Sequence, residues 1–140
     1  MKALTWRPPM ATLMLRGKVE TRSRATHYRG PVLICAGKQP YSRNHVEKEF
    51  LWNTCRPELF EEFYSKGYPW PTLGMAIAVG QLVDCYPMEL CHQKETHVPW
   101  QPGLWCHRYE DVRPIQPFPW KGRQGWRNVS QDLINSIIYL

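Results

Sequence analysis

The sequence predicts a single α+β domain built round a small β-barrel. At 140 residues the chain is long enough to bury a hydrophobic core as one domain, residues 1–140. Thirteen prolines and nine glycines interrupt it often, which favours short strands and turns over long helices. About five apolar stretches have the length of strands, and helical patterns separate them. We therefore expect helices inserted after the first strand and in the middle of the chain, and a C-terminal helix.

The N-terminal third begins as a strand followed by a helix. Residues 3–6 predict a short strand and residues 8–16 a short helix, because proline is tolerated in a first turn and Gly17 ends the pattern. A second strand is expected from Lys18, where charged and apolar residues alternate. The apolar run 32–36 predicts a third strand. A charged strand face is therefore expected beside a buried strand.

The middle of the chain changes character twice. Residues 42–66 mix acidic and apolar side chains and predict a helical insertion of two helices broken near Pro57. Residues 73–85 form the strongest strand pattern, with Gly80 marking a bulge or a close backbone approach. Residues 86–103 carry prolines and histidines and are expected to form a loop.

The C-terminal part is expected to complete the barrel. Residues 104–109 and 112–117 have the pattern of two strands. The segment 118–129 places paired glycines between basic and aromatic residues, which is typical of a loop. Ser130 is a good N-cap for a final helix over 131–140.

The charge of the chain narrows the class of partner. The formal net charge is +6 and the isoelectric point is about 9.2, so the surface should attract anions. Nucleic acid, nucleotides and acidic membranes remain open, as does a small enzyme charged for solubility. No segment approaches the roughly 20 apolar residues that span a bilayer, so no membrane insertion is expected. Five cysteines with no CxxC pair, and an N-terminus unlike a signal peptide, predict a reduced, cytoplasmic setting.

Histidines and cysteines gather between residues 91 and 107. They occur as Cys91-His92, His97 and Cys106-His107. Adjacent Cys-His pairs do not reproduce the usual spacing of zinc ligands. The sequence also has no phosphate-binding glycine loop and no Ser-His-Asp pattern. We therefore predict no metal and no cofactor.

Three segments in order carry a family resemblance. They read LTWRPPMATLMLRGKVETRSRATHYRGPVLICAGK, then GMAIAVGQLVDC, then LWCHRYEDVRPIQPFPWKGRQGW. Together they resemble the signature blocks of the ASCH domain, a member of the PUA-like superfamily, over about residues 3–129. The resemblance implies a PUA-like barrel with a basic cleft beside the strand that carries Lys18, Glu20 and Arg22.

Some ASCH-like proteins are similar to amidohydrolases that deacylate N4-acylated cytidine. The resemblance implies a lysine, a threonine three residues later and a glutamate from a neighbouring strand, and Lys18 and Thr21 match the first two. Two departures stand against it: the family's KxxE is shortened to Lys18-Val19-Glu20, and Gln81 replaces the glutamate of ELVDC. Glutamine cannot act as a base, so Glu20 is the only nearby carboxylate that remains for the role of the family's glutamate.

The strand geometry adds a condition to this enzymatic hypothesis. In it, Lys18 activates the hydroxyl of Thr21, which attacks the acyl group. In an unbroken strand these two side chains face opposite sides. The hypothesis therefore requires a bend or bulge between them.

The alternative is a site that binds RNA or a modified cytidine nucleoside without chemistry. Cations would neutralise phosphates, Glu20 would accept hydrogen bonds from a base or orient an arginine, and tryptophans would stack bases. The candidate binding residues are Arg22, Arg24, Arg29, Lys121 and Arg123, with Trp6, Trp105 or Trp126 as stacking partners.

Two structural interpretations and a third function stay open. The alternating charges are also typical of a solvated strand face, and tryptophans usually fill the core. The insertion at 42–66 could instead serve a protein-interaction adaptor through Phe50, Trp52 or Phe63. The sequence does not name a protein partner.

Overall fold

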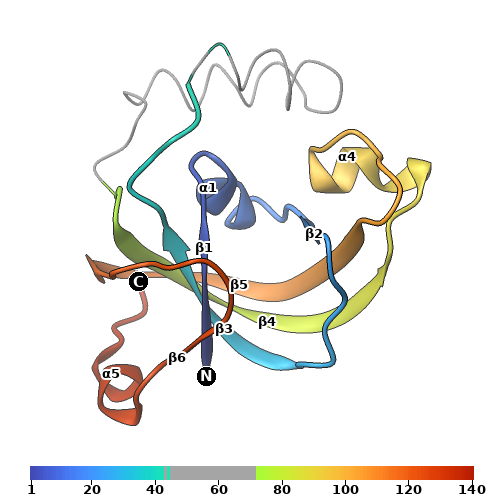
Figure 1. Cartoon of the computed structure of the whole chain (residues 1–140). Coiled ribbons are helices and arrows are strands. Elements are labelled where there is room, and N and C mark those ends of the chain that lie inside the picture. The colour runs from blue at the N-terminus through green and yellow to red at the C-terminus, as the bar shows by residue number, and fades with distance from the viewer. Residues whose placement is uncertain (43, 45–71) are drawn as a thin grey trace.

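The computed structural model describes residues 1–42, 44 and 72–140, which form a curled six-stranded sheet (Figure 1). The strands are β1 (Lys2–Trp6), β2 (Glu20–Arg22), β3 (Gly30–Ala36), β4 (Met75–Pro87), β5 (Trp105–Pro119) and β6 (Arg127–Asn128). Their order in the sheet is β2-β5-β4-β3-β1-β6, and only β1 and β3 pair in parallel. The sheet bends into a half-barrel, so the predicted α+β, PUA-like class is confirmed.

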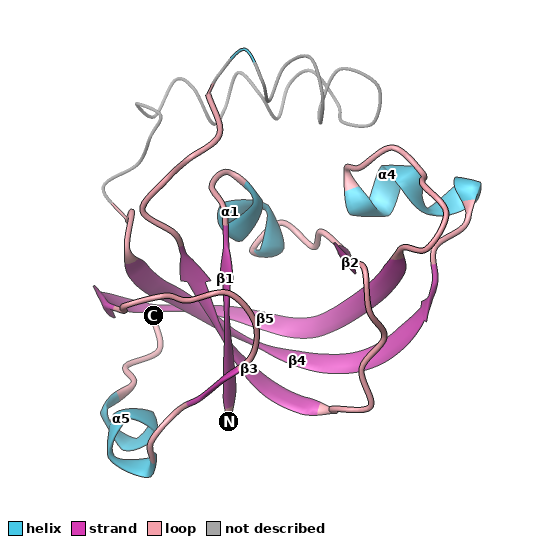
Figure 2. Ribbon diagram, in the orientation of Figure 1, coloured by secondary structure: helices cyan, strands magenta, loops and turns pink. Residues whose placement is uncertain are grey.

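Short helices accompany this sheet (Figure 2). They are α1 (Met10–Met14), the 3-10 helix η2 (Leu90–His92), α4 (Gln93–Thr96) and α5 (Gln131–Ser136). The predicted helices after the first strand and near the C-terminus are therefore present. Apart from Ser42 and Asn44, the predicted insertion at 42–66 lies outside the described residues. In the described part of the chain, no helix is both long and apolar enough to cross a membrane.

Both faces of the central strands are buried. On the face covered by α1, Leu13 and Met14 of the helix pack with Ile34 of β3 and Leu82 of β4. The opposite face is covered by α5 and holds these buried residues: Ala3, Leu33, Cys35, Ala76, Val79, Ile115 and Val129. Burial on both faces explains why β3 and β4 read as nearly continuous apolar runs.

The predicted pair of strands at 104–109 and 112–117 is one continuous strand, β5. Val79 of β4 pairs with Arg113, and Gln81 pairs with Glu110, so β5 holds one extra residue across this step. A bulge absorbs that residue without ending the strand, and Asp111 adopts a left-handed φ of 47° there. The interruption between the two predicted strands is therefore a bulge and not a break.

The predicted final helix is shorter than residues 131–140. Ser130 caps it, because its Oγ accepts a hydrogen bond from the Leu133 N–H, but α5 ends at Ser136. The last residues run back along β5, where Tyr139 bridges to Ile115 and the Leu140 N–H donates to Pro114 O. Pairing with β5 replaces the remaining helical turn.

Candidate functional site

The end of α1 sets the position of Lys18. Gly17 adopts a left-handed φ of 86°, its N–H donates to Met14 O, and the Lys18 N–H donates to Leu13 O. These two hydrogen bonds form the Schellman motif that commonly ends a helix at glycine. Lys18 therefore lies before β2 and not within it, and it is only 3% exposed.

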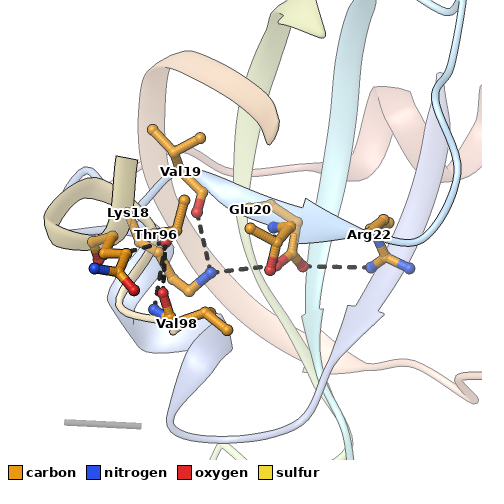
Figure 3. Close-up of polar contacts among 8 residues, drawn as sticks. Lys18, Val19, Glu20, Arg22, Thr96 and Val98 are labelled. Atoms are coloured by element: carbon orange, nitrogen blue, oxygen red, sulfur yellow. Dashed lines mark hydrogen bonds and ion pairs between the residues drawn. The ribbon is translucent and has the colours of Figure 1, made fainter. Parts of the chain in front are cut away.

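Glu20, the first residue of β2, lies between two cations (Figure 3). Its Oε1 is 3.2 Å from Lys18 Nζ and accepts the Thr21 N–H at 2.8 Å. Its Oε2 is 3.5 Å from a terminal nitrogen of Arg22. The side chain of Glu20 is 9% exposed and that of Arg22 is 28% exposed, so the carboxylate is the buried centre of the network.

Aromatic rings support the outer end of this network. The guanidinium carbon of Arg22 is 5.4 Å from the ring centre of Trp6, which in turn meets Tyr109 edge to face at 6.0 Å. Burial raises the pKa of Tyr109, and the negative charge of Glu20 raises it further, while Arg22 opposes both. Among the described residues, Trp6 Nε1, Arg22 Nε and Tyr109 OH are buried without a hydrogen-bond partner.

The network lines a cavity of about 350 Å³, the first of two cavities. Its lining residues are Thr5, Trp6, Arg7, Met10, Lys18, Glu20, Thr21, Arg22, Ser23, Tyr41 and Val98. The structure thus brings all three predicted catalytic residues together with Arg22 and Trp6. The volume falls within the range of small-molecule sites in proteins.

A second cavity, of about 570 Å³, adjoins the first. Its lining residues are Thr5, Arg7, Gly37, Lys38, Gln39, Lys121, Gly122, Arg123 and Gln124, so the two cavities share Thr5 and Arg7. The predicted binding residues Lys121 and Arg123 lie here. Four cations and no carboxylate occur among these described lining residues, and we call this space the cationic cavity.

Three other predicted binding residues line neither cavity. The carbonyl of Arg24 bonds to His107 Nε2, and Arg29 donates to the carbonyls of Thr26 and Tyr28 within its own turn. Trp105 is half-buried in β5, opposite Arg22 of β2. Arg24 and Arg29 therefore shape the segment that connects β2 to β3.

Trp126 and Gln81 also lie away from both cavities. Trp126 packs against Tyr28 with ring centres 5.6 Å apart. Gln81 is paired with Glu110 of β5 and Pro31 of β3. The position at which the family resemblance expects a glutamate therefore does not contribute to the lining of the first cavity.

The sequence reasoning missed Arg7 and Lys38. Trp6 pairs with Ala36 at the ends of the parallel strands β1 and β3, so residues just after each strand leave the sheet at the same edge. The carboxyl ends of parallel strands commonly carry ligand sites. The missing signal was the parallel pairing, which neither segment reveals alone.

Metal-ligating side chains meet at one place in the described residues. Ligand atoms of Glu89, Cys91 and His92 lie within 4.8 Å of one another. All three belong to one short segment, and His92 Nδ1 already accepts the Glu89 N–H at 2.9 Å. Cys106 and His107, by contrast, are buried in β5.

The curled half-barrel is an ASCH-type, PUA-like fold. The crystal structure of ASCH from Zymomonas mobilis has a TM-score of 0.59 and 12% sequence identity, with 97% of this chain and 94% of that chain covered. A point mutant of the same protein gives a TM-score of 0.56 and 12% identity, with 97% of each chain covered. No family model and no curated protein matches the sequence. The likeness therefore establishes the fold.

Proposed function

We propose that this domain binds RNA or a modified nucleoside by taking a nucleobase into the first cavity, which we call the base cavity for this reason. The observation that carries the proposal is the Glu20 carboxylate, 7% exposed as a residue, held between Lys18 and Arg22 at the wall of a cavity of about 350 Å³. A buried charge is costly unless it is paired, and this paired carboxylate lies at the wall of a cavity, where a ligand can donate hydrogen bonds to it.

The chemistry of the network suits the polar edge of a base. An ammonium has three N–H donors, and Lys18 Nζ donates to Val19 O at 3.1 Å and to Glu20 Oε1, which leaves one for a ligand. Glu20 accepts hydrogen bonds, as a carboxylate does from the exocyclic amine of cytosine. Arginine planes can also stack on bases, and Arg22 is partly exposed beside Trp6.

Deacylation of an N4-acylated cytidine is the second candidate. The observation in its favour is that Lys18, Glu20 and Thr21 line one cavity. A general base needs a free lone pair, however, and Lys18 Nζ acts as a donor to two oxygens. Among the described residues, no hydrogen bond joins the Thr21 hydroxyl to Lys18. These contacts favour binding over hydrolysis.

Titration with cytidine, N4-acetylcytidine and a short single-stranded RNA tests the first proposal. Replacing Glu20→Gln removes the charged acceptor, and we expect affinity to fall at least about tenfold, because hydrogen bonds to charged groups contribute roughly 1.5–3 kcal/mol. Glu110→Gln is the matched control, since Glu110 is exposed on β5 and lines neither cavity. A folded wild-type protein that binds none of the three ligands would overturn the proposal.

The hydrolysis assay separates the two candidates. The absorbance of N4-acetylcytidine is followed with wild-type protein, Lys18→Ala and Thr21→Ala. Turnover that is lost in both variants would establish the amidohydrolase. Binding without turnover supports recognition alone.

A further inference from the structure

We propose that the cationic cavity holds the phosphate backbone of a single-stranded RNA whose base occupies the base cavity. The inference rests on the proposed function and adds the class of ligand: a strand with phosphates, and not a free nucleoside. The inference follows from three observations: the charge of the cavity, the close contact that fixes the loop carrying Lys121 and Arg123, and the residues that the two cavities share.

The charge of the cavity calls for a polyanion. Lys38, Lys121 and Arg123 are exposed and Arg7 borders them, and no carboxylate lies among the described lining residues. Like charges gathered round one space repel one another, and an anion that neutralises them relieves the repulsion. Phosphates bound by lysine and arginine also release their condensed counterions, which favours association.

The loop that carries Lys121 and Arg123 is pressed against β1. A Cβ at Gly122 would lie 2.6 Å from Thr5 Oγ1 and 3.0 Å from Thr5 Cγ2, distances that only glycine avoids. The loop is also anchored at its start, where the Trp120 N–H donates to Gly74 O. Lys121 and Arg123 therefore flank a fixed contact with Thr5.

Thr5 and Arg7 are common to the two cavities. Both residues line each cavity, so the two spaces lie side by side at the end of β1, as a ligand that occupies both requires. Arg7 is held at this boundary because its Nε donates to Gln39 O at 3.0 Å and its guanidinium lies 4.2 Å from the ring centre of Tyr41. Its other N–H donors serve a phosphate between the two spaces.

Two sources of phosphate share this chemistry: the terminal group of a mononucleotide and the phosphodiesters of RNA. The cationic cavity is larger than the base cavity, at about 570 Å³ against 350 Å³, and its cations come from three separate segments. Four cations from three segments offer more partners than one phosphate group needs. A strand with successive phosphates fits better.

The test compares the full chain with Lys121→Ala/Arg123→Ala. Cytidine, cytidine 5′-monophosphate and a pentanucleotide RNA are titrated at several salt concentrations, and circular dichroism verifies that each protein is folded. The double variant should bind the RNA at least about tenfold more weakly. Its salt slope should fall by roughly 1.4, because each phosphate that a cation neutralises on a single strand contributes about 0.7 to the slope. Its affinity for uncharged cytidine should change little.

Lys94→Ala/Arg108→Ala is the matched control. It also removes one lysine and one arginine, and both are exposed and line neither cavity. An equal loss of RNA affinity in the control would show that only net charge matters and would overturn the inference. An unchanged salt slope in Lys121→Ala/Arg123→Ala would overturn it as well.

The three ligands keep the two proposals apart. If the protein binds cytidine, but binds the RNA no more tightly and without salt dependence, the proposed function stands and this inference is wrong. If cytidine 5′-monophosphate binds as tightly as the RNA, one phosphate is sufficient, and the assignment to a strand is overturned. Absence of binding to any ligand would instead remove the proposed function itself.

Discussion

Lys18 Nζ lies 3.2 Å from Glu20 Oε1 although Lys18 precedes β2 and Glu20 begins it. Their side chains are 1% and 9% exposed, so the pair is removed from water. Two residues that follow each other at i and i+2 of a regular strand share a face, but here a helix-ending turn positions one and a strand the other. The pair therefore couples the end of α1 to the edge of the sheet.

Substitutions of Lys18 and Glu20 should change the free energy of unfolding in a non-additive way. Removing one partner of a buried pair leaves a buried charge without its partner and typically costs about 3–5 kcal/mol, whereas apolar replacement of both is often neutral. We expect Glu20→Leu to destabilise the fold strongly, and Lys18→Met less, because Arg22 still pairs with Glu20. The double variant should be destabilised by less than the sum of the two, as measured by urea unfolding.

Exposed Lys94→Ala serves as the reference, with an expected change within about 0.5 kcal/mol. If the destabilisations of the two single variants simply add, the pair does not couple and the site is held by other contacts.

Two glycines allow stability to be separated from site geometry. Gly17 and Gly103 have left-handed φ angles of 86° and 85°, and a Cβ at either position would meet no atom within 4 Å. Alanine should therefore cost about 1–2 kcal/mol at each position through backbone strain alone. Only Gly17 belongs to the turn that places Lys18.

Thermal melts should consequently shift by similar amounts in Gly17→Ala and Gly103→Ala. Nucleoside titrations should show weaker binding in Gly17→Ala and no change in Gly103→Ala. Equal affinities in the two variants would mean that the turn does not set the position of Lys18.

Much of the fold follows from local patterns. The apolar runs predicted β3 and β4, and alternation near residue 18 predicted that Val19 points away from its charged neighbours. Val19 does pack in a small core cluster with Cys106 and Met88, while Glu20 pairs with Lys18 and Arg22. Such patterns are readable from the sequence because alternate residues of an extended segment point to opposite faces.

The predictions that failed concern features that depend on contacts between residues far apart in the sequence. The bulge at Asp111 is defined by pairing with β4, and the last residues become extended because β5 offers them hydrogen bonds. The turn at Gly17 places Lys18 before β2, so Lys18 and Thr21 do not belong to one regular strand, and both line the same cavity. Arg7 and Lys38 meet only because β1 and β3 pair in parallel.

The thiols should differ in reactivity by burial. Cys91 is exposed, whereas burial raises the pKa of Cys35 to about 12 and that of Cys106 to about 11. The thiolate is the reactive form, so the two buried cysteines should resist alkylation at pH 8 until the protein unfolds. Peptide mapping after iodoacetamide should find Cys91 modified before Cys35 and Cys106, and rapid labelling of Cys106 in the folded protein would contradict this picture.

His107 should make stability depend on pH. It is 1% exposed, and its Nε2 lies 2.9 Å from Arg24 O, which can only accept, so Nε2 carries the proton of the neutral ring. Burial lowers the pKa of His107; the Arg24 hydrogen bond and the charge of Glu20 oppose this, whereas Arg22 and Arg29 add to it. The unfolded chain therefore binds a proton that the folded chain does not.

The sign of the effect follows from this difference. Stability from His107 is fully present above its unfolded pKa of about 6.5 and is lost as pH falls below that value toward the lower folded pKa. Urea unfolding between pH 7.5 and pH 5 should show a decline that is shallower in His107→Gln, whose amide can still donate to Arg24 O. His27→Gln, at an exposed position, should keep the wild-type slope. A His107→Gln profile that parallels wild type would assign the acid sensitivity to other groups.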